Sequence, residues 1–181
     1  MQQKPLTDAE LLVLGLVAEM PRHGYELEQV IEQRGMREWT EIGFSSIYFV
    51  LGRLEKMRLV RAAKPVRAKA KKSYTATDAG REALAAQTLA ALSTVRPTHS
   101  SLQLGMLHWP MVERDSALAA LEARGKAVDA ELARLGNIQI DQQPLPDYVE
   151  ALFEYAIGQL RAEADWIART RDYMAHRPQL T

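Results

Sequence analysis

The stretch between residues 43 and 77 limits the fold of this chain more than any other, because it predicts a helix that leads into a β-hairpin. Ile47, Leu51 and Leu54 are spaced by four and three residues, so they form one apolar stripe on a helix over residues 43–57. The opposite side of this helix carries small or basic side chains and one phenylalanine, all free to face a partner. They are Ser45, Ser46, Phe49, Arg53 and Lys56.

The hairpin, over residues 59–76, has a strongly basic turn. Five cations and no acid occur within residues 64–72, namely Lys64, Arg67, Lys69, Lys71 and Lys72. Such a cluster is typical of a surface that neutralises DNA phosphates, although a solvated lysine-rich hairpin has the same composition. The adjoining helix favours the first interpretation, because sequence-reading DNA modules combine a helix for the major groove with a basic arm for the backbone.

The composition excludes some classes of function. The 181 residues include no cysteine, so disulfides, thiolate catalysis and cysteine-ligated zinc are excluded. The formal net charge is zero, which allows a local basic face but not a wholly basic protein. No run of about 18 apolar residues occurs, and the N-terminal stretch lacks the apolar core of a signal peptide. We therefore expect a cytoplasmic protein that does not use a membrane.

The N-terminal half predicts two more helices before the stretch described above. Thr7 and Glu10 form a capping-box pattern at the start of a helix over residues 6–20. A second helix over residues 25–34 is ended by Gly35. The resulting order is helix, turn, helix, connector, helix and basic hairpin, which is the order of a winged helix-turn-helix.

Three blocks of the chain follow the order and spacing of a known family. They are His23-Gly24-Tyr25-Glu26-Leu27, then Ser46-Ile47-Tyr48-x-x-Leu51-x-Arg53-Leu54-Glu55, then Lys71-Lys72-x-Tyr74-x-x-Thr77-x-x-Gly80. In these blocks, which together cover roughly residues 6–95, the chain resembles the PadR family of bacterial transcriptional regulators. The resemblance implies a winged helix that reads a palindromic operator as a homodimer joined by C-terminal helices. It also implies a repressor, and in some members a small molecule releases the DNA.

The chain departs from the family pattern at a few positions. Phe44 and Phe49 replace prolines, Arg58 replaces the glycine before the first wing strand, and Ser73 and Ala76 replace a Tyr and a Leu. Because some of these residues lie on the reading helix, the operator of a relative cannot be assumed here. Arg58 ends its helix without the usual glycine, which costs about 1 kcal/mol.

The C-terminal half predicts a helical domain. A helix from Thr77 to about residue 95 ends the DNA-binding domain at residue 96, and residues 97–181 form the second domain. We expect a helix that is stopped by Gly136 and a last helix over residues 147–176, both with apolar stripes. A self-contained antiparallel hairpin and a homodimer can both bury such stripes; the need for two DNA half-sites favours the dimer. The side chains expected in the dimer contact are Leu118, Leu121, Val128, Leu132, Leu152, Phe153, Leu160 and Ile167.

The predicted contacts with double-stranded DNA lie in the first domain. His23 begins the second helix, where free amides can take a phosphate. Tyr48 is either partly buried or reaches a phosphate with its hydroxyl, and the resemblance favours the phosphate. Arg53 either contacts a phosphate or pairs with Glu55 or Glu41. The full set of expected DNA contacts is His23, Tyr25, Ser45, Ser46, Tyr48, Phe49, Arg53, Lys56, Lys64, Arg67, Lys69, Lys71 and Lys72.

The aromatic residues of the second domain have two interpretations. Met106, Trp109, Tyr155 and Trp166 either line a pocket for a flat aromatic effector or belong to the interface core. No motif predicts an enzyme, a cofactor or a metal site, because the four histidines are scattered and no nucleophile elbow or glycine-rich phosphate loop occurs. The sequence therefore predicts a mainly α protein with a small β-hairpin wing that represses transcription. The alternative is a ligand-sensing or protein-interaction adaptor that kept the scaffold and lost DNA binding.

Overall fold

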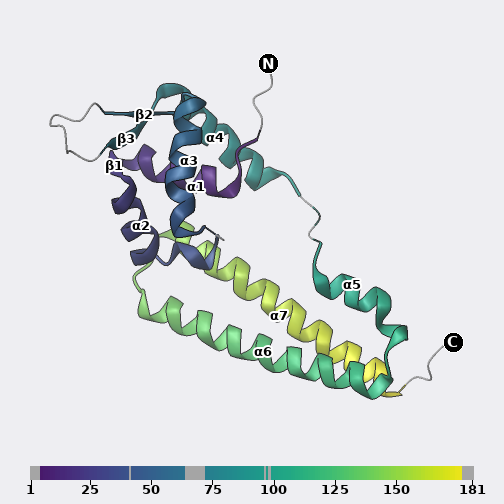
Figure 1. The fold of residues 1–181 in the computed structure, drawn as a ribbon. Helices are drawn as coiled ribbons and strands as arrows, with labels where there is room; N and C mark the ends of the chain where they lie inside the picture. The colour runs from purple at the N-terminus through teal and green to yellow at the C-terminus, as the bar shows by residue number, and fades with distance from the viewer. Residues whose placement is uncertain (1–4, 41, 64–71, 96, 98, 177–181) are drawn as a thin grey trace. The chain divides into compact units, whose positions relative to one another are not determined.

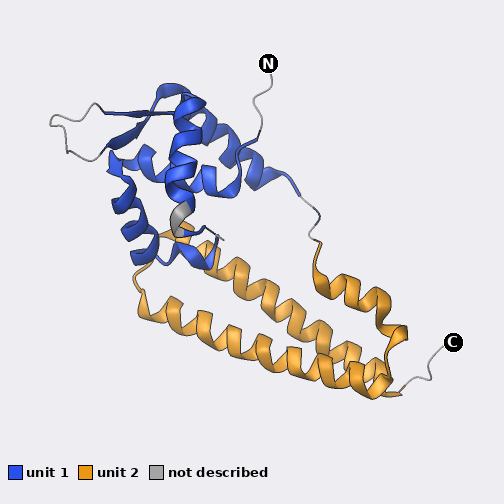
Figure 2. Ribbon diagram, in the orientation of Figure 1, with its two compact units in different colours: residues 1–97 blue, residues 98–181 orange. Residues whose placement is uncertain are grey.

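The computed structural model describes residues 5–40, 42–63, 72–95, 97 and 99–176. The chain divides into two compact units, residues 1–97 and residues 98–181, each with its own apolar core (Figure 2). The sequence analysis places the domain boundary between residues 96 and 97. No helix among the described residues is both long enough and apolar enough to cross a membrane.

In its described residues, unit 1 contains five helical segments and three short strands (Figure 1). In chain order they are α1 (Asp8–Glu19), β1 (Arg22–His23), α2 (Gly24–Gln33), η1 (Met36–Glu38), α3 (Phe44–Lys56), β2 (Val60–Ala62), β3 (Ser73–Ala76) and α4 (Asp78–Ser93). Unit 2 is helical in its described residues. Its elements are α5 (Ser101–His108), η2 (Trp109–Met111), α6 (Arg114–Asp141) and α7 (Asp147–His176).

The helix starts follow local sequence signals. Thr7 caps α1, and the Glu10 carboxylate accepts a hydrogen bond from the Thr7 backbone N–H at 2.8 Å, so the predicted capping box is confirmed. Thr77 caps α4 by accepting a hydrogen bond from the Gly80 N–H at 3.0 Å. A Cβ added at Gly80 would lie 2.0 Å from the Leu59 carbonyl oxygen, so only glycine allows α4 to pack this closely on the start of β2.

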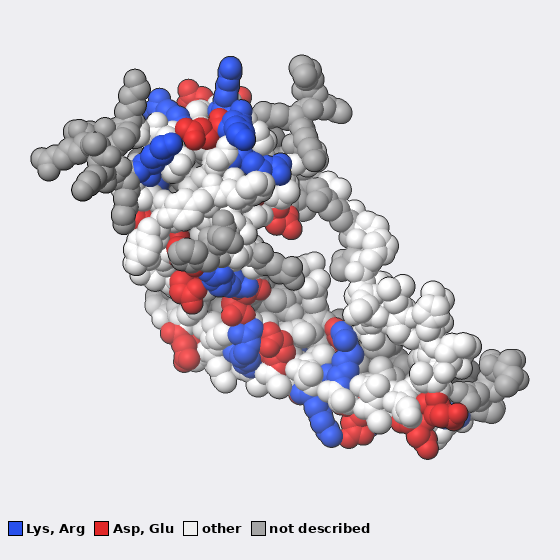
Figure 3. All heavy atoms as spheres, in the orientation of Figure 1, with Lys and Arg blue, Asp and Glu red and all other residues white. Residues whose placement is uncertain are grey.

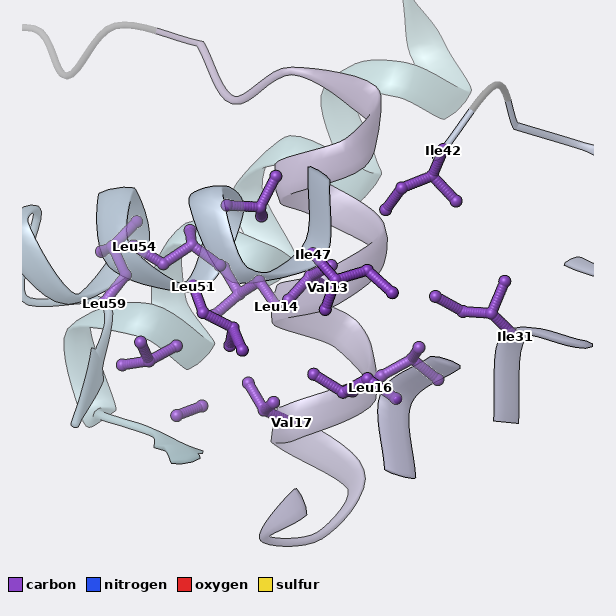
Figure 4. Packing of buried hydrophobic residues seen from close by; sticks show 14 residues of the cluster. Val13, Leu14, Leu16, Val17, Ile31, Ile42, Ile47, Leu51, Leu54 and Leu59 are labelled. Carbon is purple, nitrogen blue, oxygen red and sulfur yellow. The ribbon is translucent and has the colours of Figure 1, made fainter. Parts of the chain in front are cut away.

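The core of unit 1 forms where α3 crosses α1 (Figures 1 and 4). The predicted stripe of Ile47, Leu51 and Leu54 is buried, which confirms the orientation of α3. Figure 4 shows these side chains pointing towards Val13 and Leu14 of α1. This arrangement turns one face of α3 inward and leaves the opposite face at the surface.

The predicted hairpin of β2 and β3 is confirmed, and β1 adds a third strand, so the wing sheet is three-stranded and antiparallel. Its strand order is β1-β3-β2, and β1 pairs Arg22 with Tyr74. The sequence analysis left residues 21–24 as the turn between the first two helices, which is wrong for Arg22 and His23. The reason is a tertiary contact, because both residues pair with β3. Arg22 is also held locally, since its Nε donates to the Leu16 carbonyl at 3.1 Å and its guanidinium bonds the Glu19 carboxylate at 2.8 Å.

Glu19 ties the end of α1 to both neighbouring segments. Its carboxylate accepts hydrogen bonds from Arg34 at 2.7 Å and from Arg22 at 2.8 Å. The Arg34 hydrogen bond, helped by Arg22, lowers the pKa of Glu19 below its ordinary value. The carboxylate therefore stays ionised in mildly acidic solution and keeps β1 and the end of α2 connected to α1.

The end of α3 forms a Schellman motif with a non-glycine residue in the left-handed position. The Leu59 N–H donates to the Leu54 carbonyl at 3.0 Å, and the Arg58 N–H donates to the Glu55 carbonyl at 2.9 Å. Arg58 has φ of 59°, which an L-residue adopts at a cost of about 1 kcal/mol. The expected helix end without a glycine is therefore confirmed.

Unit 2 has a longer hairpin than the sequence predicts. We expected Gly136 to stop the helix, but α6 continues to Asp141, so that expectation is wrong. An interior glycine only weakens a helix by about 1 kcal/mol, and burial of Leu135 outweighs this cost. The helix ends instead before Pro144, whose ring cannot continue it.

The two long helices of unit 2 bury their stripes on each other. Leu121 and Val128 of α6 pack with Ile167 and Met174 of α7 in one apolar cluster. An ion pair between Arg171 and Glu122, at 3.1 Å, joins the same two helices. The antiparallel helical hairpin is therefore formed within one chain.

Replacing Arg58 with glycine is expected to raise the free energy of unfolding by about 1 kcal/mol, because glycine adopts the left-handed conformation without strain. Urea unfolding followed by circular dichroism measures this change. Arg58→Ala is the matched control, since it removes the same charge but keeps the strained Cβ. An equal gain in both variants would show that charge, and not backbone strain, limits stability here.

Candidate nucleic-acid interface

The exposed face of α3 carries the predicted contact residues. Tyr48 is 55% exposed and Phe49 is 66% exposed, and Arg53 and Lys56 also reach the surface. Ser46 is half-buried, and the side chain of Ser45 lies outside the described part of the structure. The core contacts on the other side of α3 fix this face in one orientation.

Tyr48 brings together the first and second of the three sequence blocks. A Cβ added at Gly24 would lie 2.5 Å from the Tyr48 ring, so the ring lies directly on the first residue of α2. Gly24 therefore allows α2 and α3 to approach each other closely. The Tyr48 side chain is packed on one side and exposed on the other, so it is partly buried as one interpretation expected. Its contact with a phosphate stays a prediction.

His23 lies at the N-cap of α2, as predicted, but its amide already has a partner. The His23 backbone N–H donates to the Glu26 carboxylate at 2.6 Å. A bound phosphate would compete with this carboxylate for the same N–H. Phosphate contact by His23 therefore remains a prediction. Tyr25, two residues further on, is exposed.

Arg53 has an ionic partner that the sequence analysis did not identify. Its Nε lies 2.8 Å from Oε1 of Glu10 and not beside Glu55. Glu10 is only 2% exposed, because it lies four residues before the buried Leu14 on the same face of α1. The four-residue spacing between Glu10 and Leu14 therefore indicated that Glu10 faces the core. The sequence analysis did not use this signal, because it interpreted Glu10 only as part of the capping box with Thr7.

The same arginine also holds an aromatic ring. The Arg53 Cζ lies 5.9 Å from the centroid of the Phe49 ring, within the range of a cation–π contact. Glu10, Arg53 and Phe49 thus form a series of contacts from the buried side of α1 to the exposed face of α3.

A second arginine positions the start of α3. Arg37 of η1 bonds Glu28 of α2, donates to Glu32 at 3.0 Å and donates to the Ile42 carbonyl at 2.6 Å. Ile42 directly precedes Gly43, the N-cap of α3. These contacts connect α2 to the residue at which α3 begins.

Basic side chains gather at the end of unit 1 where α3 gives way to the wing. Figure 3 shows Lys and Arg side chains over this end of the unit. Lys56, Arg58, Arg61 and Lys72 are exposed in this region, and the sequence analysis had not included Arg58 or Arg61 among the contacts. The remaining predicted cations lie outside the described residues. They are Lys64, Arg67, Lys69 and Lys71.

The wing strand β3 also carries a half-buried tyrosine. Burial raises the pKa of Tyr74 above its ordinary value, and the nearby Glu55 carboxylate adds to the effect. The hydroxyl therefore stays protonated throughout the neutral range and remains a hydrogen-bond donor at the base of the wing.

Unit 2 contains a hollow lined by most of the predicted effector residues. Met106, Trp109 and Trp166 line a cavity of about 460 Å³, together with Arg169 and others. Tyr155 does not line it, because it lies eleven residues before Trp166 on the same helix, roughly 16 Å away. The Tyr155 hydroxyl instead accepts a hydrogen bond from Gln159 at 2.9 Å.

A family model matches part of the chain. Residues 13–86, which lie in unit 1, match the model described as the transcriptional regulator PadR-like family. Over these residues the chain is similar to PadR-like regulators. Among curated proteins, none matches this chain.

Solved structures of PadR-like proteins share the fold. Bacillus subtilis PadR in complex with operator DNA has a TM-score of 0.71 and 18% identity, over 91% of this chain and 98% of that one. The same protein in complex with p-coumaric acid has a TM-score of 0.72 and 20% identity, over 92% and 98%. A PadR-like regulator from Bacillus cereus has a TM-score of 0.65 and 18% identity, over 93% and 98%. At these identities the similarity is one of fold.

Most side chains predicted for the dimer contact of this protein are covered within one chain. Leu121, Val128, Phe153 and Ile167 are buried. Leu118, Leu132 and Leu160 are partly buried against the same hairpin cluster, and only Leu152 is exposed. Their role in a dimer therefore stays a prediction.

Metal ligands do not gather in the described part of this chain. Across residues 5–40, 42–63, 72–95, 97 and 99–176, no group of three or more His, Asp or Glu side chains is placed to hold a metal ion.

Replacing Arg53 with alanine is expected to lower the free energy of unfolding by about 2 kcal/mol, because Glu10 stays buried without its ionic partner. Adding Glu10→Gln to that variant should recover part of the loss, since a neutral amide is less costly to bury than a carboxylate. Urea unfolding measures both effects. Arg61→Ala, which removes an exposed cation from β2, serves as the control and should change stability by less than about 0.5 kcal/mol. Equal losses for Arg53→Ala and Arg61→Ala would contradict the role of the ion pair.

Proposed function

We propose that this protein is a PadR-like repressor that binds a palindromic DNA operator as a homodimer in the cytoplasm and leaves it when a small molecule binds. The observation that carries the proposal is the exposed face of α3, which is bordered by cations and fixed by core packing on its other side. The protein acts by binding and not by catalysis. The operator complex of Bacillus subtilis PadR supports the same use of the shared fold.

In this proposal α3 enters the major groove and the wing follows the DNA backbone. A single α-helix fits the major groove, and side chains on its exposed face reach base edges. Ser45, Ser46 and Phe49 would face bases, while Tyr48 and Lys56 would face phosphates. The wing cations neutralise the flanking backbone, and the two reading helices of a dimer lie about 34 Å apart, one turn of DNA.

The homodimer needs an apolar surface that one chain leaves uncovered. The short helix α5 and the following η2 supply such a surface, because Leu104, Leu107 and Met111 are all more than half exposed. An isolated helix of eight residues is marginal in water, so α5 gains stability when a second copy covers it. Leu152 on α7 can contribute to the same contact.

The cavity of unit 2 is the proposed effector site. Its volume of about 460 Å³ suits a small molecule, and its two tryptophans offer flat surfaces for an aromatic ring. Bacillus subtilis PadR has been observed in complex with p-coumaric acid, which supports an effector for the present protein as well. A ligand that favours one spacing of the two reading helices would change the affinity for the operator.

Fluorescence anisotropy with duplexes selected from a randomised pool tests the DNA-binding function. We expect the selected duplex to bind about a thousandfold more tightly than a scrambled one, with affinity that falls as salt rises. Equal and weak binding of both duplexes would overturn the proposed repressor function. It would favour the alternative, a ligand-sensing or protein-interaction adaptor that kept the scaffold and lost DNA binding.

The wing is tested by changing Lys69, Lys71 and Lys72 together to alanine. We expect weaker binding to all duplexes and a slope of log affinity against log salt that is shallower by up to about three, because each phosphate contact contributes close to one. The control removes three cations from unit 2, with Lys126→Ala, Arg134→Ala and Arg161→Ala, and should leave the slope unchanged. An unchanged slope in the wing variant would contradict its contact with the backbone.

The dimer surface is tested by changing Leu104 and Leu107 to lysine. Sedimentation velocity should show monomers, and circular dichroism should show retained helix, because both side chains are exposed. By contrast, glutamate at Leu160 and Ile167 should unfold the hairpin, since it places charge in the cluster between α6 and α7. An intact dimer of the lysine variant would show that the subunits meet elsewhere.

A further inference from the structure

Phe49 is the most exposed large apolar side chain among those that the structure describes on α3. It is 66% exposed, on a face that also carries Ser46, a tyrosine, cations and a glycine. A single exposed apolar side chain is common on protein surfaces, so exposure alone does not indicate a role. Two further observations distinguish this one.

The first observation is that the ring is held in place. The Arg53 guanidinium lies over one side of the ring, with 5.9 Å between Cζ and the ring centroid. Arg53 is itself anchored through its Nε to the buried Glu10 carboxylate at 2.8 Å. A contact surface that is fixed before binding loses less conformational freedom when a partner arrives.

The second observation is a gap next to the ring. Gly52 follows Phe49 by three residues and therefore lies on the same side of α3. A Cβ added at Gly52 would have no other atom within 4 Å, so packing in this chain does not require a glycine there. A missing side chain at this position lets a partner approach the backbone of α3 beside Phe49.

We propose that Phe49 reads a thymine in the operator through the 5-methyl group of that base. This inference rests on the proposed DNA-binding function. In the major groove, thymine is the base that presents a methyl group, and an apolar side chain can contact it. Phe49 has no donor or acceptor for the other groups on the base edges, and Gly52 allows α3 to come close enough for the contact.

Thymine-to-uracil scanning of the selected duplex tests the inference, because uracil differs from thymine only by the missing methyl. Each thymine is replaced by deoxyuridine in turn, and anisotropy gives the affinity of the full chain. We expect one position in each half-site to lose about fourfold in affinity, which corresponds to the removal of one buried methyl group. Replacing cytosine by 5-methylcytosine elsewhere should not reproduce the effect.

The Phe49→Ala variant assigns the methyl contact to its residue. This variant should bind the thymine and uracil duplexes equally at the sensitive position, whereas Phe49→Leu should keep part of the difference. Tyr148→Ala is the matched control, since Tyr148 is an aromatic residue of similar exposure, 70%, on α7. It should keep the fourfold difference.

Two results would overturn the inference. A selected duplex whose uracil substitutions are all silent overturns it even if Phe49→Ala fails to fold, because that scan needs only the unchanged protein. A sensitive position that stays sensitive in folded Phe49→Ala overturns it as well. If the selection yields no preferred duplex, the proposed function fails first, so the two failures are distinguishable.

Discussion

The candidate DNA-contact surface depends on one constraint on α3. The helix must be held firmly by one face while the other stays free for a partner. The buried side chains Ile47, Leu51 and Leu54 satisfy the first condition through contact with α1. Arg37 adds a polar restraint where α3 begins, and the Schellman motif at Arg58 defines where it ends. The contacts that set the position of the candidate DNA-contact surface are therefore distinct from those that set its length.

A buried carboxylate extends this restraint to the exposed face. Glu10 accepts a hydrogen bond from the Thr7 N–H and also holds Arg53, so one side chain both caps α1 and fixes a cation on α3. A charge buried to this degree is unfavourable unless it is paired. The pairing therefore links the stability of unit 1 to the arrangement of its candidate DNA-contact surface.

The sequence was informative wherever the signal was local. The apolar spacing on residues 43–57, the capping box at Thr7 and the strained helix end at Arg58 depend on neighbours within one or two turns, and all three are present. Long-range partners were missed for the opposite reason. Spacing could not show that Arg22 pairs with Tyr74 or that Arg53 reaches Glu10, because each contact joins segments that are far apart in the sequence. The length of α6 was underestimated because a glycine was given more weight than the apolar residues around it.

The wing sheet has a consequence for how copies of this protein can associate. Its middle strand β3 is paired on both sides, and the edge strands β1 and β2 have only two and three residues. Edges this short offer few unpaired amides and carbonyls to a strand from another molecule. Within the described residues, the addition of strands from other molecules to this sheet is therefore disfavoured, and so is fibre growth from it. Association of copies is then left to other surfaces, and it gives a closed dimer where the same patch of both copies meets.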